Sequence, residues 1–354
     1  MQTDDRVRDD TATSLRAYMR RVTGTLSIDY VDPPQRIAGG FDTTIYSFRL
    51  SAAPAPFDVP LIVRIYREEQ RVEVARFETA VHGAVGAQGY PAPPILATGD
   101  SAAGLGGAFV IMPLAAGRTM LEAFFSLRLF TMVDLLASSQ ARLHALDVGM
   151  FERALSDAHV EWRKFTDDFD KLPTGELDIN SFPGLRPGVA WISANAPATA
   201  APVICHGDFH PLNLIVNGSK LTAVIDWTRT RVAPAEFDVG GTVALIKQGP
   251  VQLPRVLAPF LRLARRGLAA RYVAQYRKHR PLDEDGIRYF EAVRCFAFLY
   301  EVSVVRLARA GVIGPTTKPT AFEEPQLVRS ISARFREITG ITIEPVADRQ
   351  TLSD

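Results

Sequence analysis

The chain has 354 residues, 47% of them hydrophobic and 22% charged, and its formal net charge is +1. So balanced a charge gives no global field to attract nucleic acid or an anionic membrane, and we expect neither as a partner. Two cysteines, Cys205 and Cys295, are too few for a disulfide framework. The first ten residues lack the apolar core of a signal peptide, and no stretch approaches the roughly 20 apolar residues that cross a bilayer. We therefore expect a cytoplasmic location.

The amino-terminal part has the pattern of short strands and helices. A helix is expected over residues 12–22, and two strand-like segments flank Gly39 and Gly40 in RIAGGFDTTIYSFRL. The glycine pair can be a plain hairpin turn. It can also form a loop whose backbone N–H groups approach phosphate oxygens, because glycine has no Cβ.

A buried strand with a single charge is predicted at Pro60–Tyr66, PLIVRIY. The charge is Arg64, and a lone charge in an apolar strand is costly unless it is paired. The helix predicted over Glu69–Val85 offers Glu73 and Glu78 as partners. In the alternative, Arg64 lies on an edge strand and faces solvent.

The strand Ala108–Leu114 precedes a break in the pattern and is the predicted hinge between two lobes. Its edge could offer backbone groups to a nucleotide base. Pro113 has no N–H, so Met112 and Leu114 are the candidates for that contact. We expect an amino-terminal nucleotide-binding lobe over residues 1–113 and a catalytic and acceptor-binding lobe over residues 114–354.

The stretch Val203–Asn213, VICHGDFHPLN, starts as an apolar strand and then becomes polar. Asp208 and Asn213 are five positions apart, the interval between the base and the metal-binding amide in a kinase catalytic loop. A second apolar run ends at Asp226, and the turn at Asn217–Gly218 would join the two strands in a hairpin. Two carboxylates and an amide at one end of a hairpin could hold Mg²⁺ and accept a hydroxyl proton.

Two other interpretations apply to the same stretch. His206, Asp208 and His210 could bind a transition metal, because the two histidines have the four-residue spacing of a zinc helix. Pro211 and the preceding strand argue against a helix there. The stretch could also be a polar hairpin with no catalytic role, although three suitable oxygen donors coincide in it.

The run CHGDFHPLNLIV followed by AVIDW resembles the aminoglycoside phosphotransferase and choline kinase-like family, relatives of the protein kinases. Further matches follow in the family's order over most of residues 36–245. They are IAGGFDTTIYSF for the nucleotide loop, LIVRIY for the phosphate-contacting strand, RFETAV for its paired helix, VIMPLAAGRTM for the hinge, QARLHALD for the helix before the catalytic loop and APAEFDVGG for the segment after the metal aspartate.

The resemblance implies that Asp208 is the catalytic base and that Asn213 and Asp226 bind Mg²⁺. It implies that Arg64 contacts phosphate and pairs with Glu78, which fits the family's position better than Glu73. The remaining residues that it assigns to the nucleotide are Gly39, Gly40, Thr43, Met112 and Leu114. The sequence departs from the family at two positions, with Arg64 where Lys is commoner and Pro113 where a hydrogen-bonding residue is frequent.

We therefore expect a two-lobed, protein-kinase-like α/β (α+β) fold, with a small antiparallel sheet and one paired helix ahead of a large helical lobe. The predicted enzyme is a small-molecule kinase that moves the γ-phosphate of ATP or GTP, with Mg²⁺ as cofactor, to a hydroxyl. It is expected to be a monomer or homodimer. The alternative is a nucleotide-binding pseudokinase or regulatory module without transferase activity.

The acceptor pocket is expected to form from residues 150–195 and the helices after residue 245. Several large apolar side chains there favour an acceptor with apolar surface, as in macrolide kinases: Trp162, Phe290, Phe296, Phe298 and Tyr300. An aminoglycoside would need many carboxylates, for which the candidates are Glu236, Glu301 and the group at 167–170. The acceptor could equally be a metabolite.

Overall fold

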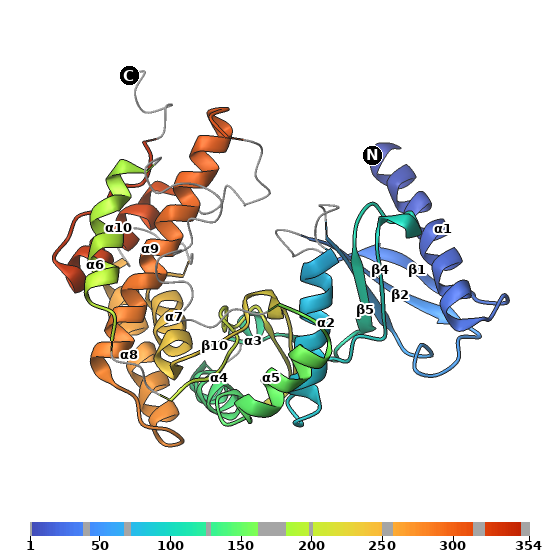
Figure 1. The fold of residues 1–354 in the computed structure, drawn as a ribbon, viewed down its shortest axis with the longest axis horizontal. Coiled ribbons are helices and arrows are strands. Elements are labelled where there is room, and N and C mark those ends of the chain that lie inside the picture. Colours follow the sequence, from blue (N-terminus) through green and yellow to red (C-terminus); the bar gives the residue numbers. More distant parts are fainter. Residues whose placement is uncertain are drawn as a thin grey trace. The chain divides into compact units, whose positions relative to one another are not determined.

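The computed structural model describes residues 2–37, 43–66, 72–124, 129–161, 182–197, 201–249, 258–313 and 323–347 (Figure 1). The chain divides into two compact units. The first unit contains Met1–Arg118, Gly149–Trp162 and Ile215–Thr228, and the second contains Thr119–Val148, Arg163–Leu214 and Arg229–Asp354. The first unit thus takes in two later segments, and a lobe boundary after Pro113 stays a prediction.

The first unit is built on a five-stranded antiparallel sheet with the strand order β1-β2-β3-β5-β4. The central strand, β3, is LIVRIY and pairs with β2 on one side and β5 on the other. The strands are β1 (Asp29–Arg36), β2 (Thr43–Ser51), β3 (Leu61–Tyr66), β4 (Ala97–Gly99) and β5 (Phe109–Pro113).

Each face of this sheet is covered by a different helix. Leu61, Val63 and Ile65 of β3 pack in one cluster with side chains of α1 (Gln2–Thr23). The alternate residues of β3 face the other way, because side chains alternate along a strand, and Tyr66 packs there with α2 (Val72–Gly86). Arg64 is two residues before Tyr66, so its side chain lies on the same face of the sheet and points toward α2.

The later segments of the first unit contain α5 (Val148–Asp157) and most of a three-stranded sheet in the order β6-β8-β9. Its strands are β6 (Arg118–Thr119), β8 (Leu214–Asn217) and β9 (Lys220–Val224). Gly218 has a φ of 63° in the tight connection between β8 and β9. The turn predicted at Asn217–Gly218 is confirmed, but it joins β8 to β9, whereas Val203–Cys205 pairs with Arg231–Ala233.

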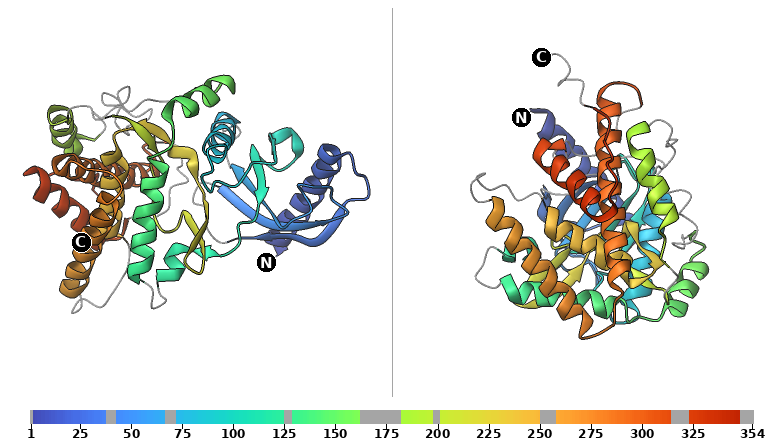
Figure 2. Two further views of the ribbon diagram at one scale, coloured as in Figure 1. Left: turned by 90° about the horizontal axis from the view of Figure 1, so that it is seen from below. Right: turned by 90° about the vertical axis from the view of Figure 1, so that its left-hand side faces the viewer.

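The second unit is mostly helical, with one short strand pair, β7 (Val203–Cys205) and β10 (Arg231–Ala233). Its helices are α3 (Met120–Phe124), α4 (Leu129–Leu143), α6 (Arg186–Ala194), α7 (Ala235–Gln248), α8 (Ala258–Arg277), α9 (Glu284–Arg309) and α10 (Pro325–Thr339) (Figure 2). Within the described ranges, no helix is both long enough and apolar enough to cross a membrane. The predicted fold class, a small antiparallel sheet followed by a large helical part, is confirmed.

The core of the second unit is centred on α9, and this corrects one prediction. Phe290, Phe296 and Tyr300 of α9 are 1%, 0% and 5% exposed and pack in the core with α6, β7 and α10. They cannot form the wall of an acceptor pocket, because the apolar side of this 26-residue helix is covered by its neighbours. Phe298 is partly buried against the same core. Trp162 lies outside the described residues.

Candidate active site

In the first unit, the guanidinium of Arg64 forms hydrogen bonds with three polar side chains beside the middle strand of the sheet. Its Nη1 donates to Glu78 Oε1 at 2.7 Å, its Nη2 to Asp226 Oδ1 at 3.0 Å and its Nε to Thr43 Oγ1 at 3.3 Å. The ion pair with Glu78 is therefore confirmed, and the solvent-facing alternative is wrong because β3 is the central strand. The side chain of Arg64 is only 12% exposed.

Glu78 is fully buried and would be costly to ionise without its partners. Burial alone would raise its pKa, but Arg64, the His82 ring and the Tyr66 hydroxyl together lower the pKa of Glu78 to about 2. The Tyr66 hydroxyl donates to Oε2, while His82 Nε2 lies 3.7 Å from Oε1. Burial also acts to lower the pKa of Arg64, yet the carboxylates of Glu78 and Asp226 raise it above its ordinary value.

This cluster predicts an acid-dependent loss of stability. Because the pKa of Glu78 falls from 4.5 to about 2 on folding, its stabilisation is complete above pH 4.5 and is lost as the pH falls toward 2. The effect is on the order of 3 kcal/mol. Unfolding followed by circular dichroism from pH 7 to pH 2 should show a smaller acid loss for Glu78→Gln than for the wild type. The exposed Glu73→Gln on the same helix is the control, and equal acid profiles for all three proteins would contradict the prediction.

Asp226 follows β9 with an unusual backbone conformation. Its φ is +67°, in the left-handed region that residues other than glycine rarely adopt. The next residue, Trp227, is fully buried and its Nε1 donates to Val224 O at 2.9 Å, which fixes the turn. The Thr228 hydroxyl joins Arg64 at Oδ1 of Asp226. In the described part of the chain both hydrogen bonds to this carboxylate use Oδ1, so Oδ2 is open to a ligand.

In the second unit, the loop after β7 is closed on itself by Asn213. The Nδ2 of Asn213 donates to the backbone oxygen of Asp208 at 3.0 Å, and its N–H donates to His210 O at 2.9 Å. The N–H of Asp208 donates to His206 Nδ1 at 3.2 Å. The amide nitrogen of Asn213 thus faces the loop, and its oxygen has no donor among the described residues.

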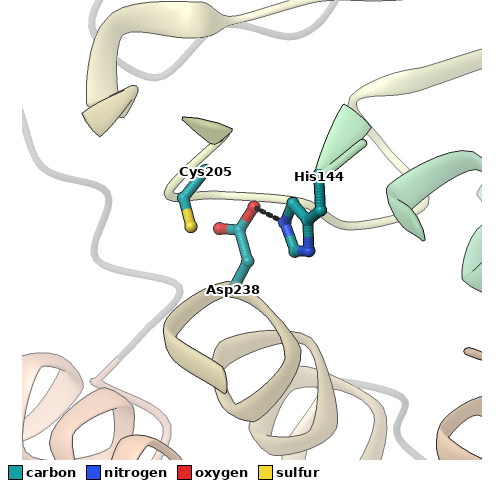
Figure 3. Close-up of side chains that lie close together, drawn as sticks. All are labelled: His144, Cys205 and Asp238. Atoms are coloured by element: carbon teal, nitrogen blue, oxygen red, sulfur yellow. Dashed lines mark hydrogen bonds and ion pairs between the residues drawn. The ribbon is translucent and has the colours of Figure 1, made fainter. Parts of the chain in front are cut away.

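Asp238 of α7 stabilises the loop through hydrogen bonds to its backbone. The carboxylate of Asp238 accepts hydrogen bonds from the N–H groups of His206 and Gly207, both at 2.7 Å, and lies 3.2 Å from His144 Nε2 (Figure 3). Gly207 has a φ of +81°, and a Cβ there would lie 2.2 Å from the backbone oxygen of Arg229. Only glycine fits this close approach.

Figure 3 also shows Cys205 beside Asp238 and His144, and the ligand atoms of these three buried residues lie within 4.8 Å of one another. Both oxygens of Asp238 already accept hydrogen bonds from backbone N–H groups. The Nδ1 of His144 lies in a hydrogen bond of 2.6 Å with the Tyr276 hydroxyl. Burial and the nearby Asp238 raise the pKa of the Cys205 thiol well above its ordinary value, whereas a metal needs the thiolate. We interpret the trio as a hydrogen-bonded support for the loop. The trio that the sequence suggested for a transition metal does not form a ligand group in the described residues.

Replacing Asp238 with Ala should lower the free energy of unfolding by about 2–5 kcal/mol, because two backbone N–H groups and His144 would lose their shared acceptor. Asp238→Asn keeps one acceptor oxygen and should lose less. Urea unfolding of both variants measures the difference. An Asp238→Ala protein as stable as the wild type would contradict this role.

The Asp208 carboxylate is surrounded by basic side chains. Its Oδ1 accepts from Arg294 Nη2 of α9 at 2.6 Å, and its Oδ2 lies 3.3 Å from His210 Nε2. Burial would raise the pKa of Asp208, but Arg294, His210 and Arg229 outweigh burial and hold this pKa well below its usual value. Asp208 is therefore ionised at neutral pH. Sequence reasoning missed Arg294, although a single basic residue within EAVRCFAFLY was a signal for it.

The other residues assigned to the nucleotide have mixed outcomes. Gly39 and Gly40 lie outside the described residues. Thr43 is buried beside Arg64, and Met112 is buried where β5 packs on α2. Leu114 donates its N–H to Pro60 O at 2.8 Å, so that donor is not left for a nucleotide base. The structure brings together Thr43, Arg64, Glu78 and Asp226 in one unit and Asp208 and Asn213 in the other.

This fold, a small antiparallel sheet followed by a large helical part, is the kinase-like fold of phosphotransferases. The chain belongs to the phosphotransferase enzyme family, whose model matches residues 34–282. No curated protein sequence matches the chain closely enough to count as a relative.

Several solved structures have a similar fold. A thermostable mutant of the aminoglycoside phosphotransferase APH(4)-Ia, in a complex with ADP and hygromycin B, has a TM-score of 0.61 at 15% identity and covers 92% of this chain and 98% of its own. An aminoglycoside-3'-phosphotransferase of type VIII has a TM-score of 0.52 at 17% identity, and the match covers 81% of this chain and 99% of that protein. Macrolide 2'-phosphotransferase type I has a TM-score of 0.51 at 14% identity, and the match covers 91% of this chain and 96% of that protein. At these identities the similarity is one of fold.

Proposed function

We propose that this protein transfers the γ-phosphate of ATP to a hydroxyl group of a small molecule, with Mg²⁺ as cofactor. The products are ADP and the phosphate ester of the acceptor, and the hydroxyl proton is released. The observation that carries the proposal is the loop in which Asn213 Nδ2 holds the backbone oxygen of Asp208, within a chain of the phosphotransferase enzyme family.

Asp208 is the proposed catalytic base. Its carboxylate is ionised at neutral pH and 19% exposed, so it can accept a hydrogen bond from an acceptor hydroxyl. Phosphoryl transfer depends mainly on positioning and on neutralising charge, and a weakly basic carboxylate is sufficient for it. Asp208 would orient the hydroxyl toward the phosphorus and take its proton as the new bond forms.

The residues expected to bind Mg²⁺ fit that ion individually. Mg²⁺ prefers oxygen ligands, and both the amide oxygen of Asn213 and Oδ2 of Asp226 lack a donor among the described residues. When bound, Mg²⁺ neutralises charge on the phosphate oxygens. Arg64 has five N–H donors, of which three make the contacts described above, so two have no acceptor among the described residues and could bind a phosphate.

ATP is the proposed donor. ADP in the complex of APH(4)-Ia supports an adenine nucleotide, since that protein shares the fold of this chain. The hygromycin B in the same complex supports a small-molecule acceptor. A cytoplasmic location and a monomeric or homodimeric state complete the proposal as expectations from the sequence.

A screen for phosphoryl acceptors tests the proposal. The purified protein is incubated with ATP, Mg²⁺ and a library of hydroxyl compounds that includes aminoglycosides, macrolides and hydroxy acids, and mass spectrometry detects the added phosphoryl group. We expect at least one product that EDTA abolishes and that the Asp208→Asn substitution strongly reduces. If the protein binds ATP and no compound in the library is phosphorylated, it is a nucleotide-binding module and the proposal fails.

A further inference from the structure

Arg294 lies at the one carboxylate that the acceptor hydroxyl has to reach. Its Nη2 donates to Asp208 Oδ1 at 2.6 Å from the middle of α9. The Arg294 side chain is 25% exposed, and Asp208 is its only hydrogen-bond partner among the residues that the structure describes. Four of its five N–H groups thus have no acceptor in the described part of the chain.

Two basic residues that contact Glu291 of the same helix are satisfied differently. Arg334 makes a two-pronged contact with Glu291, at 2.7 and 2.8 Å, and Lys247 joins it at 2.9 Å. Glu291 is 1% exposed, so this network is structural. Arginine–carboxylate pairs are frequently bidentate in this way. Arg294 makes a single contact, and it makes that contact with the proposed catalytic base.

The side chains that surround Asp208 are basic residues, and no acidic side chain contacts it among the described residues. Besides Arg294, His210 Nε2 lies 3.3 Å from Oδ2, and Arg229 also acts on the Asp208 carboxylate. The carboxylate of Glu301 accepts from Arg229 at 3.0 Å. An acceptor ammonium group placed beside Arg294 or Arg229 would meet like charge, and like charges at a binding site are unfavourable.

Two of the carboxylates expected to bind an aminoglycoside, Glu236 and Glu301, already have partners. Glu301 is paired with Arg229, while Glu236 is 7% exposed and accepts the N–H of Asp283 at 3.0 Å. The acidic group at 167–170 lies outside the described residues. Within the described ranges, neither Glu236 nor Glu301 is placed to hold an ammonium group.

We propose that Arg294 determines acceptor specificity by binding an anionic group, a carboxylate or a phosphate, that the acceptor carries close to its reacting hydroxyl. A hydroxyl that donates to Asp208 lies about 3 Å from that carboxylate. A carboxylate or phosphate two or three bonds away from the hydroxyl then comes within reach of the guanidinium, which binds such groups bidentately. This inference rests on the proposed kinase function and adds the class of acceptor to it.

The test compares acceptors that differ only in charge. Hydroxyl compounds are supplied in sets that carry a carboxylate, a primary amide or an amine at the same carbon, for example glucuronate, glucuronamide and the glucose derivative with an amine at that carbon. Phosphate esters are compared with their parent alcohols in the same way, across the library described above. We expect the wild type to favour the anionic member by about 10- to 100-fold in kcat/KM, the range of a charge-assisted hydrogen bond. Arg294→Gln should bring that ratio close to one, whereas Arg294→Lys should keep part of it.

Arg288→Gln is the matched control, because Arg288 is an exposed arginine on the same helix. It should leave the ratio unchanged. Calorimetric titration without nucleotide gives a second measure, in which Arg294→Gln weakens binding of the best anionic acceptor by about 10- to 100-fold. ATP binding measured separately should stay as in the wild type.

Two outcomes would overturn the inference, and they differ in what they say about the kinase function. If the wild type favours amide or amine acceptors, or if Arg294→Gln leaves its preference for anions intact, Arg294 does not set the acceptor class while the kinase function stands. If no acceptor of any charge is phosphorylated by a protein that binds ATP, the kinase function fails and the inference fails with it.

Discussion

Asp208→Asn is expected to lower kcat by about 10²- to 10⁴-fold, the usual contribution of a general base, with little change in the KM for ATP. Asn has nearly the shape of Asp but cannot take the proton of the acceptor hydroxyl. Its amide nitrogen would also face the Arg294 guanidinium, which now donates to Asp208 Oδ1 at 2.6 Å. Steady-state kinetics with an acceptor from the library measures both constants.

The control for this substitution is Asp285→Asn, which alters an exposed carboxylate on α9. It should leave kcat unchanged. Thermal unfolding of Asp208→Asn checks that the protein is folded at the assay temperature. A folded Asp208→Asn protein with the kcat of the wild type would remove Asp208 from the role of base.

Arg64→Ala should lower the free energy of unfolding by about 3–5 kcal/mol, because it leaves Glu78 buried without a cation. Glu78 is fully buried, and the Tyr66 hydroxyl alone cannot compensate for its charge. The double variant Arg64→Met with Glu78→Gln should lose less than Arg64→Ala, since it leaves no buried charge behind. Guanidinium chloride unfolding of each protein provides the comparison.

Arg49→Ala is the matched control, because Arg49 is an exposed arginine of β2 in the same sheet. It should change stability by no more than about 0.5 kcal/mol, as surface substitutions usually do. Arg64→Ala is also expected to weaken ATP binding, because the guanidinium is the proposed phosphate contact. If Arg64→Ala were no less stable than Arg49→Ala, the Arg64–Glu78 pair would have no structural importance.

Some of the site was predictable because its physical cause is local in sequence. The single charge of Arg64 within an apolar strand required a partner, and the helix that follows could supply one at Glu78. The five-residue interval from Asp208 to Asn213 is likewise contained in one loop, which the Asn213 side chain closes.

The rest depended on contacts between distant segments. Arg294 is 86 positions away from Asp208 and meets it only because α9 packs behind the loop. The aromatic residues of α9 were misassigned for a related reason, since periodicity shows which side of a helix is apolar but not what covers that side. Phe290 and Phe296 are buried in the core of the second unit.

The left-handed backbone of Asp226 determines which substitution can report on its carboxylate. At a φ of +67°, alanine would add conformational strain to the loss of the oxygen ligand, so Asp226→Ala would change two properties at once. Asparagine adopts this conformation more readily and keeps the size of the side chain. Asp226→Asn therefore reports the effect of losing the negative charge alone. Asp226→Gly reports the effect of losing the whole carboxylate without added backbone strain.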